Sequence, residues 1–253
     1  MQFIDTHLHL QDYKTGFATD IVKEALIGGD RKSTRQNSSH SRTGMFDWDK
    51  VARFAKQYPG TVVPAFGLHP WYLQEAKPDW LPRLREYLAR FPEALIGECG
   101  LDGIKNPDDE PQNSVFCQHI LLAEELKRPL IIHAVKAQEW LENYWDMLPA
   151  KFVFHSYNGK REVLKKILKA GGYVSFSASI LRNADKEELV NMVPADKLLL
   201  ETDGPYQGPD KNAEVTPAYI PRLAEKIAGW RGENLPDFAA RVYQNSLEFI
   251  HVG

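Results

Sequence analysis

Short apolar segments recur along the chain, and stretches with helical spacing separate them. Seven of these segments are rich in β-branched and aromatic residues and predict buried strands over 3–9, 61–69, 94–102, 129–134, 151–157, 173–179 and 197–204. Between them, apolar residues at intervals of three and four predict helices, for example over 80–91, 116–126 and 163–168. A strand followed by a helix, repeated along the chain, is the pattern of a parallel sheet.

The number and order of these segments favour a closed barrel. Seven strands without a glycine-rich fingerprint after the first are typical of a (β/α)₈ TIM barrel, not of a doubly wound dinucleotide-binding fold. A chain of 253 residues suits one such barrel, so we expect a single α/β domain over 1–253. An eighth strand is then required between positions 27 and 48.

The stretch 30–43 does not have the composition of that strand. It reads DRKSTRQNSSHSRT and contains no apolar residue, so we expect the second strand of the barrel to be disrupted. A basic loop that contacts phosphate and a solvated insertion are two explanations. The explanation we favour is a third one, because the letters resemble the translation of a sequencing-library adapter. We therefore interpret 30–43 as a sequencing artefact that replaced the native second strand, and we assign its basic residues no function.

Composition and charge restrict the setting of the protein more than its function. The net charge of −3 and the isoelectric point near 6.3 exclude a globally basic nucleic-acid binder, although an enzyme on nucleic acid needs only a local basic rim. Cys99 and Cys117 lack the spacing of a zinc site, so reduced thiols are expected. No signal sequence or membrane-spanning stretch is recognisable. We therefore expect a cytoplasmic protein that does not associate with a membrane and has no obligate protein partner.

The first predicted strand ends with two histidines, His7 and His9. Because side chains alternate along a strand, both point to the same side, toward one end of the barrel. Two imidazoles on one side can share a metal ion, but buried histidines are as often hydrogen-bonded core residues. The pair by itself leaves both explanations open.

Four later strands also end on residue types that bind metals, namely Glu98, His133, His155 and Asp203. Barrel enzymes build their sites at the C-terminal strand ends, where the loops converge. Taken singly, Glu98 and Asp203 have an alternative role as helix caps, and the two histidines as hydrogen-bonded core residues. Six such residues at five strand ends favour a metal site. Imidazoles combined with carboxylates suit one or two zinc, manganese or magnesium ions.

Seven strings resemble, in order and spacing, the TatD family of metal-dependent hydrolases, which are relatives of the amidohydrolases: FIDTHLHL, GLHPW, IGECGLD, QNSVFCQ, LIIH, FHSYNG and LLLETDGP. The resemblance covers nearly the whole chain except 30–43. It implies two metal positions that share Glu98, which stands where many amidohydrolases use a carboxylated lysine. The ligands of the first position would be His7, His9, Glu98 and Asp203, and those of the second Glu98, His133 and His155.

The same resemblance implies a 3′–5′ deoxyribonuclease that acts on single-stranded DNA. Water activated by the metals would attack the phosphodiester bond, with Glu98 and Asp203 as the catalytic carboxylates and Asp203 taking or relaying the proton. His69 fits a substrate or leaving-group contact, or else a hydrogen bond to a metal ligand. Lys136 is a candidate phosphate contact, or else an exposed lysine at a helix start. An amide or ester hydrolase, such as a deacylase, would use the same water and is the alternative.

Three features depart from the family pattern. The second strand is missing from the sequence, Lys136 follows LIIHAV where many members carry an arginine, and LLLETD continues with Gly204 where alanine is commoner. His119 and His251 fall on predicted helices away from the strand ends. We assign these two histidines no role.

Overall fold

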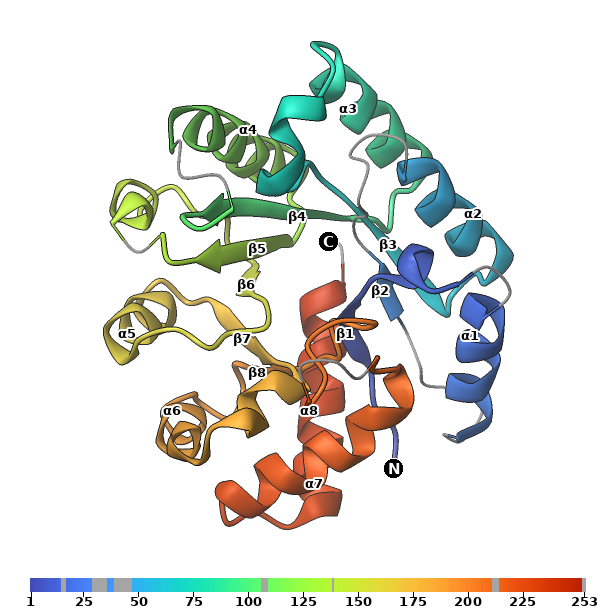
Figure 1. Ribbon diagram of the computed structural model, residues 1–253, viewed down its shortest axis with the longest axis vertical. Coiled ribbons are helices and arrows are strands. Elements are labelled where there is room, and N and C mark those ends of the chain that lie inside the picture. The colour runs from blue at the N-terminus through green and yellow to red at the C-terminus, as the bar shows by residue number, and fades with distance from the viewer. Residues whose placement is uncertain are drawn as a thin grey trace.

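Eight parallel strands form one curled sheet in which each strand neighbours the next along the chain (Figure 1). The computed structural model describes residues 1–14, 17–28, 36–38, 47–105, 109–137, 139–210 and 214–251. The strands are β1 (Asp5–Leu8), β2 (Gln36–Ser38), β3 (Val62–Phe66), β4 (Leu95–Asp102), β5 (Leu130–Val135), β6 (Phe152–Phe154), β7 (Tyr173–Phe176) and β8 (Leu198–Leu200). Each of the seven segments predicted as strands overlaps one of them, and the predicted barrel fold is confirmed.

The second strand differs from the expectation drawn from the sequence. β2 pairs in parallel with both neighbours, with Gln36 opposite Asp5 of β1 and opposite Val62 of β3. The prediction that 30–43 interrupts the barrel is therefore wrong for residues 36–38. Ladder hydrogen bonds join backbone amides and carbonyls, which every residue except proline supplies, so a polar sequence can still pair as a strand. The rest of 30–43 lies outside the described residues.

Helices surround the sheet; six of those in the described residues lie between successive strands in the chain, and two follow the last strand (Figure 1). They are α1 (Phe17–Gly28), α2 (Trp48–Gln57), α3 (Trp80–Arg90), α4 (Asp109–Leu126), α5 (Arg161–Lys169), α6 (Glu187–Asn191), α7 (Ile220–Trp230) and α8 (Leu235–Ile250). In α5, for example, Val163, Leu164 and Ile167 form a buried stripe at helical spacing, and they belong to the large apolar cluster between helices and strands. Among the described helices, none is both long enough and apolar enough to cross a bilayer.

The first and last strands meet at the mouth of the barrel, the end at which the parallel strands finish. The Asp203 N–H donates a hydrogen bond to the His7 carbonyl oxygen at 2.9 Å, and the His9 N–H donates to the Gly204 carbonyl oxygen at 2.7 Å. These two bonds join segments from opposite ends of the chain. They close the sheet at its mouth and set His7, His9 and Asp203 side by side.

The opposite end, the floor of the barrel, is filled by apolar side chains. One buried cluster contains Ile4, Val63, Ala65, Leu95, Ile131, Val153, Tyr173, Leu199, Phe249 and Ile250. The last two belong to α8, whose C-terminal end therefore packs into the floor. Lys151 holds this end of α8 in place, because its ammonium group donates hydrogen bonds to the carbonyl oxygens of Glu248 and His251 at 3.0 Å each. This helix end shields the interior of the barrel from water.

Candidate metal centre

Six buried side chains meet at the mouth: His7, His9, Glu98, His133, His155 and Asp203. Three of them lie within β1, β4 and β5, and the other three follow β1, β6 and β8 within three residues. Their ligand atoms form overlapping groups within 4.8 Å, such as His7 with Glu98 and His155, and His7 with His9 and Asp203. The structure thus brings together all six residues that the sequence analysis singled out as metal ligands.

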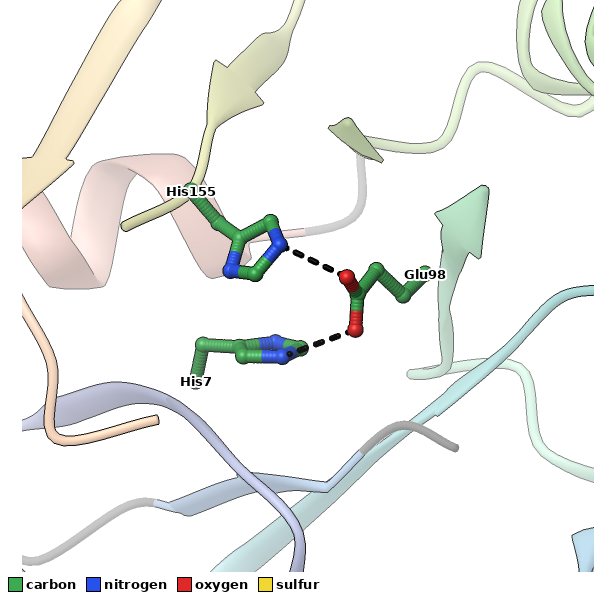
Figure 2. Close-up of side chains that lie close together, drawn as sticks. All are labelled: His7, Glu98 and His155. Atoms are coloured by element: carbon green, nitrogen blue, oxygen red, sulfur yellow. Dashed lines mark ion pairs between the residues drawn. The ribbon is translucent and has the colours of Figure 1, made fainter. Parts of the chain in front are cut away.

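Glu98 lies at the centre, and its two carboxylate oxygens face different imidazoles. Oε1 lies 2.6 Å from His155 Nε2 and 2.9 Å from His133 Nδ1. Oε2 lies 3.3 Å from His7 Nε2 and 3.8 Å from His9 Nε2. Figure 2 shows the carboxylate between His155 and His7, with one oxygen turned to each ring. One carboxylate therefore joins two groups of imidazoles, as expected of a ligand shared by two cations.

Gly100, close to Glu98 in the same strand, allows β4 to approach β5 closely enough for this arrangement. Gly100 has a φ angle of 141°, and a methyl group there would lie 2.0 Å from the carbonyl oxygen of His133. A side chain at this position would therefore be strained in its backbone and would also collide with β5. The glycine keeps Glu98 and His133 on adjacent strands within contact distance.

Asp203 pairs with the two histidines on the Oε2 side of Glu98. Its Oδ1 atom lies 2.9 Å from His9 Nε2 and 3.7 Å from His7 Nε2. Burial raises the pKa of Asp203, but the hydrogen bond with His9 and the charges of nearby imidazoles outweigh burial and lower this pKa. Burial lowers the pKa of His9, but the bond to Asp203 and the nearby carboxylates raise it to about 9. The pocket therefore favours positive charge beside its carboxylates.

His133 is oriented by a second carboxylate, that of Asp102 at the end of β4. Asp102 Oδ2 lies 2.9 Å from His133 Nε2, and Asp102 Oδ1 accepts hydrogen bonds from the N–H groups of Ile104 and Lys105. Burial raises the pKa of Asp102, but these hydrogen bonds outweigh burial and lower it, so Asp102 stays ionised. An ionised acceptor holds the proton of neutral His133 on Nε2. The Nδ1 lone pair is then directed at Glu98, as in a carboxylate–histidine–metal arrangement.

His155 is oriented in a related way by Glu201, which follows β8 and is fully buried. Glu201 Oε1 lies 3.3 Å from His155 Nδ1 and accepts a hydrogen bond from the Ser156 N–H at 2.6 Å. Burial lowers the pKa of His155, but the charges of Glu98 and Glu201 outweigh burial and raise it well above its usual value. The Glu201 carboxylate thus lies beside Nδ1, and Nε2 is the atom that faces Glu98.

His69 differs from the other imidazoles in the position of its proton. Its Nδ1 atom accepts a hydrogen bond from the Trp71 N–H at 3.1 Å, and its Nε2 atom lies 3.2 Å from Glu98 Oε1. Burial lowers the pKa of His69 to about 4, so the ring is neutral near pH 7. Since Nδ1 is an acceptor, the single proton is on Nε2. His69 therefore presents an N–H donor to the centre, whereas a metal ligand must present a lone pair.

Comparison with known proteins identifies the family. The model of the family described as TatD related DNase matches residues 4–251. The chain belongs to this family of metal-dependent hydrolases. A relative from Pantoea vagans, named 3′-5′ ssDNA/RNA exonuclease TatD, is 32% identical over 92% of this chain and 94% of its own length. The protein of the same name from Escherichia coli K12 is 31% identical over 80% of this chain and 83% of its own length.

Solved TatD structures share the fold. A TatD family hydrolase from Entamoeba histolytica superposes with a TM-score of 0.86 at 21% identity, over 98% of each chain. A TatD homologue from Escherichia coli superposes with a TM-score of 0.84 at 23% identity, over 98% of this chain and 97% of that one. These similarities support the barrel fold found here.

The departure from the family pattern at Gly204 has a packing explanation in this chain. A methyl group at this position would lie 2.1 Å from the hydroxyl oxygen of Tyr13 and 2.4 Å from the carbonyl oxygen of Val215. The Tyr13 hydroxyl and the Val215 carbonyl are hydrogen-bonded to each other. In this TatD protein, the tyrosine therefore occupies the space that the alanine methyl group would need. Lys136, the other departure, is exposed at the end of β5.

Three polar residues near the centre were missed as functional residues by the sequence analysis: Asp102, Glu201 and His119. For the two carboxylates a signal existed, because each acidic residue lies an even number of positions from a ligand in the same motif. His119 was assigned no role because it falls on α4. In the structure its Nε2 atom accepts a hydrogen bond from the Leu68 N–H at 3.0 Å, directly before His69. His119 therefore anchors the loop that carries His69. No local sequence pattern predicts this contact between His119 and Leu68.

Proposed function

We propose that this TatD protein is a metal-dependent 3′–5′ exonuclease that hydrolyses phosphodiester bonds of single-stranded DNA. The observation that carries the proposal is the position of Glu98, whose carboxylate joins two groups of buried imidazoles at the mouth. Phosphoryl transfer is often catalysed by two cations that stabilise the attacking and the leaving oxygen. The name of the relatives from Pantoea vagans and Escherichia coli agrees with this substrate class.

The donor set of the centre fits divalent cations. His7, His9, Glu98 and Asp203 would hold one cation, and Glu98, His133 and His155 the second. Asp102 is hydrogen-bonded to Nε2 of His133, and Glu201 lies beside Nδ1 of His155. These positions support the assignment, because the other ring nitrogen of each histidine faces Glu98. Bound cations supply charge that polarises the phosphoryl oxygen and lowers the pKa of water. Zinc, manganese and magnesium are the candidate ions.

Protein side chains would complete the reaction. Asp203 Oδ1, which lies 2.9 Å from His9 Nε2, is the acceptor for the proton of the attacking water. The Nε2–H of neutral His69 would donate a hydrogen bond to a non-bridging oxygen of the phosphate. Lys136, exposed beside the mouth, would contact a phosphate of the incoming strand. Burial of the six ligands keeps bulk water away from these groups.

Metal analysis combined with turnover of labelled single-stranded DNA tests the proposal. We expect bound divalent metal and release of mononucleotides from the 3′ end, with loss of activity after chelation and recovery on adding zinc, manganese or magnesium. The Glu98→Gln variant should lose both bound metal and turnover. Glu93→Gln is the matched control, because this exposed glutamate precedes the same strand at its floor end. Retained metal and turnover in Glu98→Gln would contradict the assignment of Glu98.

The alternative, an amide or ester hydrolase, uses the same centre and makes a different prediction. A deacylase should hydrolyse an acyl ester and leave single-stranded DNA intact with each of the three metals. Turnover of DNA without ester hydrolysis would support the nuclease. Ester hydrolysis without turnover of DNA would instead support the deacylase.

A further inference from the structure

We infer that Trp71 and Tyr206 are stacking platforms for nucleobases of the substrate strand, one beside each oxygen of the Glu98 carboxylate. This inference rests on the proposed nuclease function, because only a nucleic acid brings bases to the mouth. Within the described residues, three aromatic side chains are exposed to solvent: Phe17, Trp71 and Tyr206. Each of them follows a strand at the mouth. Trp71 and Tyr206 also contact imidazole rings of the centre.

Trp71 is held in a fixed orientation although 42% of it is exposed. Its indole N–H donates to Asp102 Oδ2 at 2.7 Å, and its ring stands edge-on to the ring of His69, with centroids 5.2 Å apart. A side chain that is already ordered loses little conformational entropy when a partner binds. An exposed aromatic surface fixed in this way is suited to base stacking, which tolerates every sequence because every base has a π-face.

A cation accompanies this aromatic surface. The Lys105 Nζ atom lies 5.7 Å from the centroid of the Trp71 ring, and Lys105 is itself exposed. A nucleotide whose base stacks on Trp71 would bring its phosphate within reach of this ammonium group. Aromatic side chains combined with cations are the means by which proteins bind single strands without sequence preference. The charge favours a nucleotide over a neutral apolar ligand at this position.

Tyr206 lies beside the other half of the centre. It is 43% exposed, its ring centroid is 5.6 Å from that of His9, and its hydroxyl group donates to Asp12 Oδ2 at 3.2 Å. His9 faces Oε2 of Glu98, whereas His69, which contacts Trp71, faces Oε1. The two exposed rings therefore contact histidines that face different oxygens of one carboxylate. A phosphate bound beside Glu98 would have one aromatic platform toward each neighbouring base.

Two oligonucleotides that differ only at the 3′ end test the inference. One carries natural bases, and the other carries abasic sites at its last two positions. The wild-type protein should prefer the natural strand in kcat/KM. Trp71→Ala should reduce this preference by about tenfold, and Tyr206→Leu by a similar factor, since each removes one base-stacking surface. Trp71→Phe and Tyr206→Phe are the controls, because both keep an aromatic ring and remove the hydrogen-bond donor. These controls should retain most of the preference.

The ratio between the two substrates separates stacking from a structural role. If Trp71→Ala slows both substrates equally, the indole only supports Asp102, and the inference is overturned for that residue. Equal rates on both strands by the wild-type protein would overturn the inference and leave the nuclease function intact. Hydrolysis of neither strand by the metal-loaded wild-type protein would instead contradict the proposed function.

Discussion

At the mouth of the barrel the strands end on buried histidines and carboxylates, whereas at the floor the same sheet encloses Phe249 and Ile250 in an apolar cluster. Buried ionisable groups lower stability unless each is paired, but buried apolar surface stabilises by about 25 cal/mol per Å². The comparison indicates that the floor holds the barrel together and that the mouth is arranged for chemistry at some cost in stability. Substitutions at the mouth should therefore lower kcat and retain the fold, whereas substitutions at the floor should lower the free energy of unfolding and leave kcat unchanged.

The largest effect is expected from Asp203→Asn at the mouth. The change is nearly isosteric but removes the negative charge that serves both cation and proton, so kcat should fall on the order of 10³-fold while the fold is retained. Asp196→Asn is the control, because this exposed aspartate precedes β8 whereas Asp203 follows it. Rate measurements and thermal unfolding decide the outcome. A wild-type rate with bound metal would rule out the proton role of Asp203.

At the floor, Phe249→Ala should give the opposite result. Truncating this fully buried ring leaves a cavity and should lower the free energy of unfolding by about 3–5 kcal/mol, with kcat of the folded protein unchanged. Leu121→Ala on the exposed side of α4 is a control and should change stability by no more than about 0.5 kcal/mol. Urea unfolding measures both. A loss of kcat in folded Phe249→Ala would show that the two ends are coupled.

The stability of the mouth should depend on pH through His119. Burial lowers the pKa of His119 to about 4 from its ordinary 6.5, so the unfolded chain takes up a proton first as the pH falls. The contribution of neutral His119 is complete above pH 6.5 and is lost as the pH falls toward 4. Between pH 7 and 4.5, the free energy of unfolding should fall by about 2 kcal/mol more in the wild type than in His119→Gln. Identical losses in both proteins would exclude this role.

Gly204→Ala and Gly229→Ala should change stability in opposite directions. At Gly204 the new methyl group meets Tyr13 and the Val215 carbonyl oxygen, so a loss of about 1–3 kcal/mol is expected. At Gly229, inside α7, nothing lies within 4 Å of the new methyl group, and a gain of about 0.5–1 kcal/mol is expected. Thermal unfolding compares the two. A stable Gly204→Ala variant would mean that the mouth can rearrange around Tyr13.

The smallest effect is expected from the stretch 30–43. Replacing its basic side chains by alanine should change kcat/KM on single-stranded DNA by less than about twofold, the range of a surface change without a function. The residues concerned are Arg31, Lys32, Arg35 and His40. Long-read resequencing of intact template is the direct test of the artefact hypothesis, and confirmation of the DRKSTRQNSSH codons would end it.

The strands that are buried on both faces could be predicted from the sequence, because such strands consist of continuous apolar segments. It also predicted the six residues that converge at the mouth, since ligand types at the ends of parallel strands must lie near one another. A second strand was required between positions 27 and 48, but β2 could not be located there because its residues carry no apolar pattern. Asp102 had a local signal that was not used, whereas His119 escaped as a functional residue because its partner, Leu68, lies 51 positions away. Contacts at such distances follow from the closed barrel and not from local patterns.

The contact that closes the barrel also governs when the centre can exist. His9 and Asp203 are 194 positions apart, and they meet only after the last strand has reached the first. Contacts between such distant segments form late, because the chain between them must already be ordered. During synthesis, a chain that has exposed β1 but not yet β8 possesses His7 and His9 without Asp203. The centre thus assembles in the final stage of folding, and an unfinished chain carries no complete hydrolytic site.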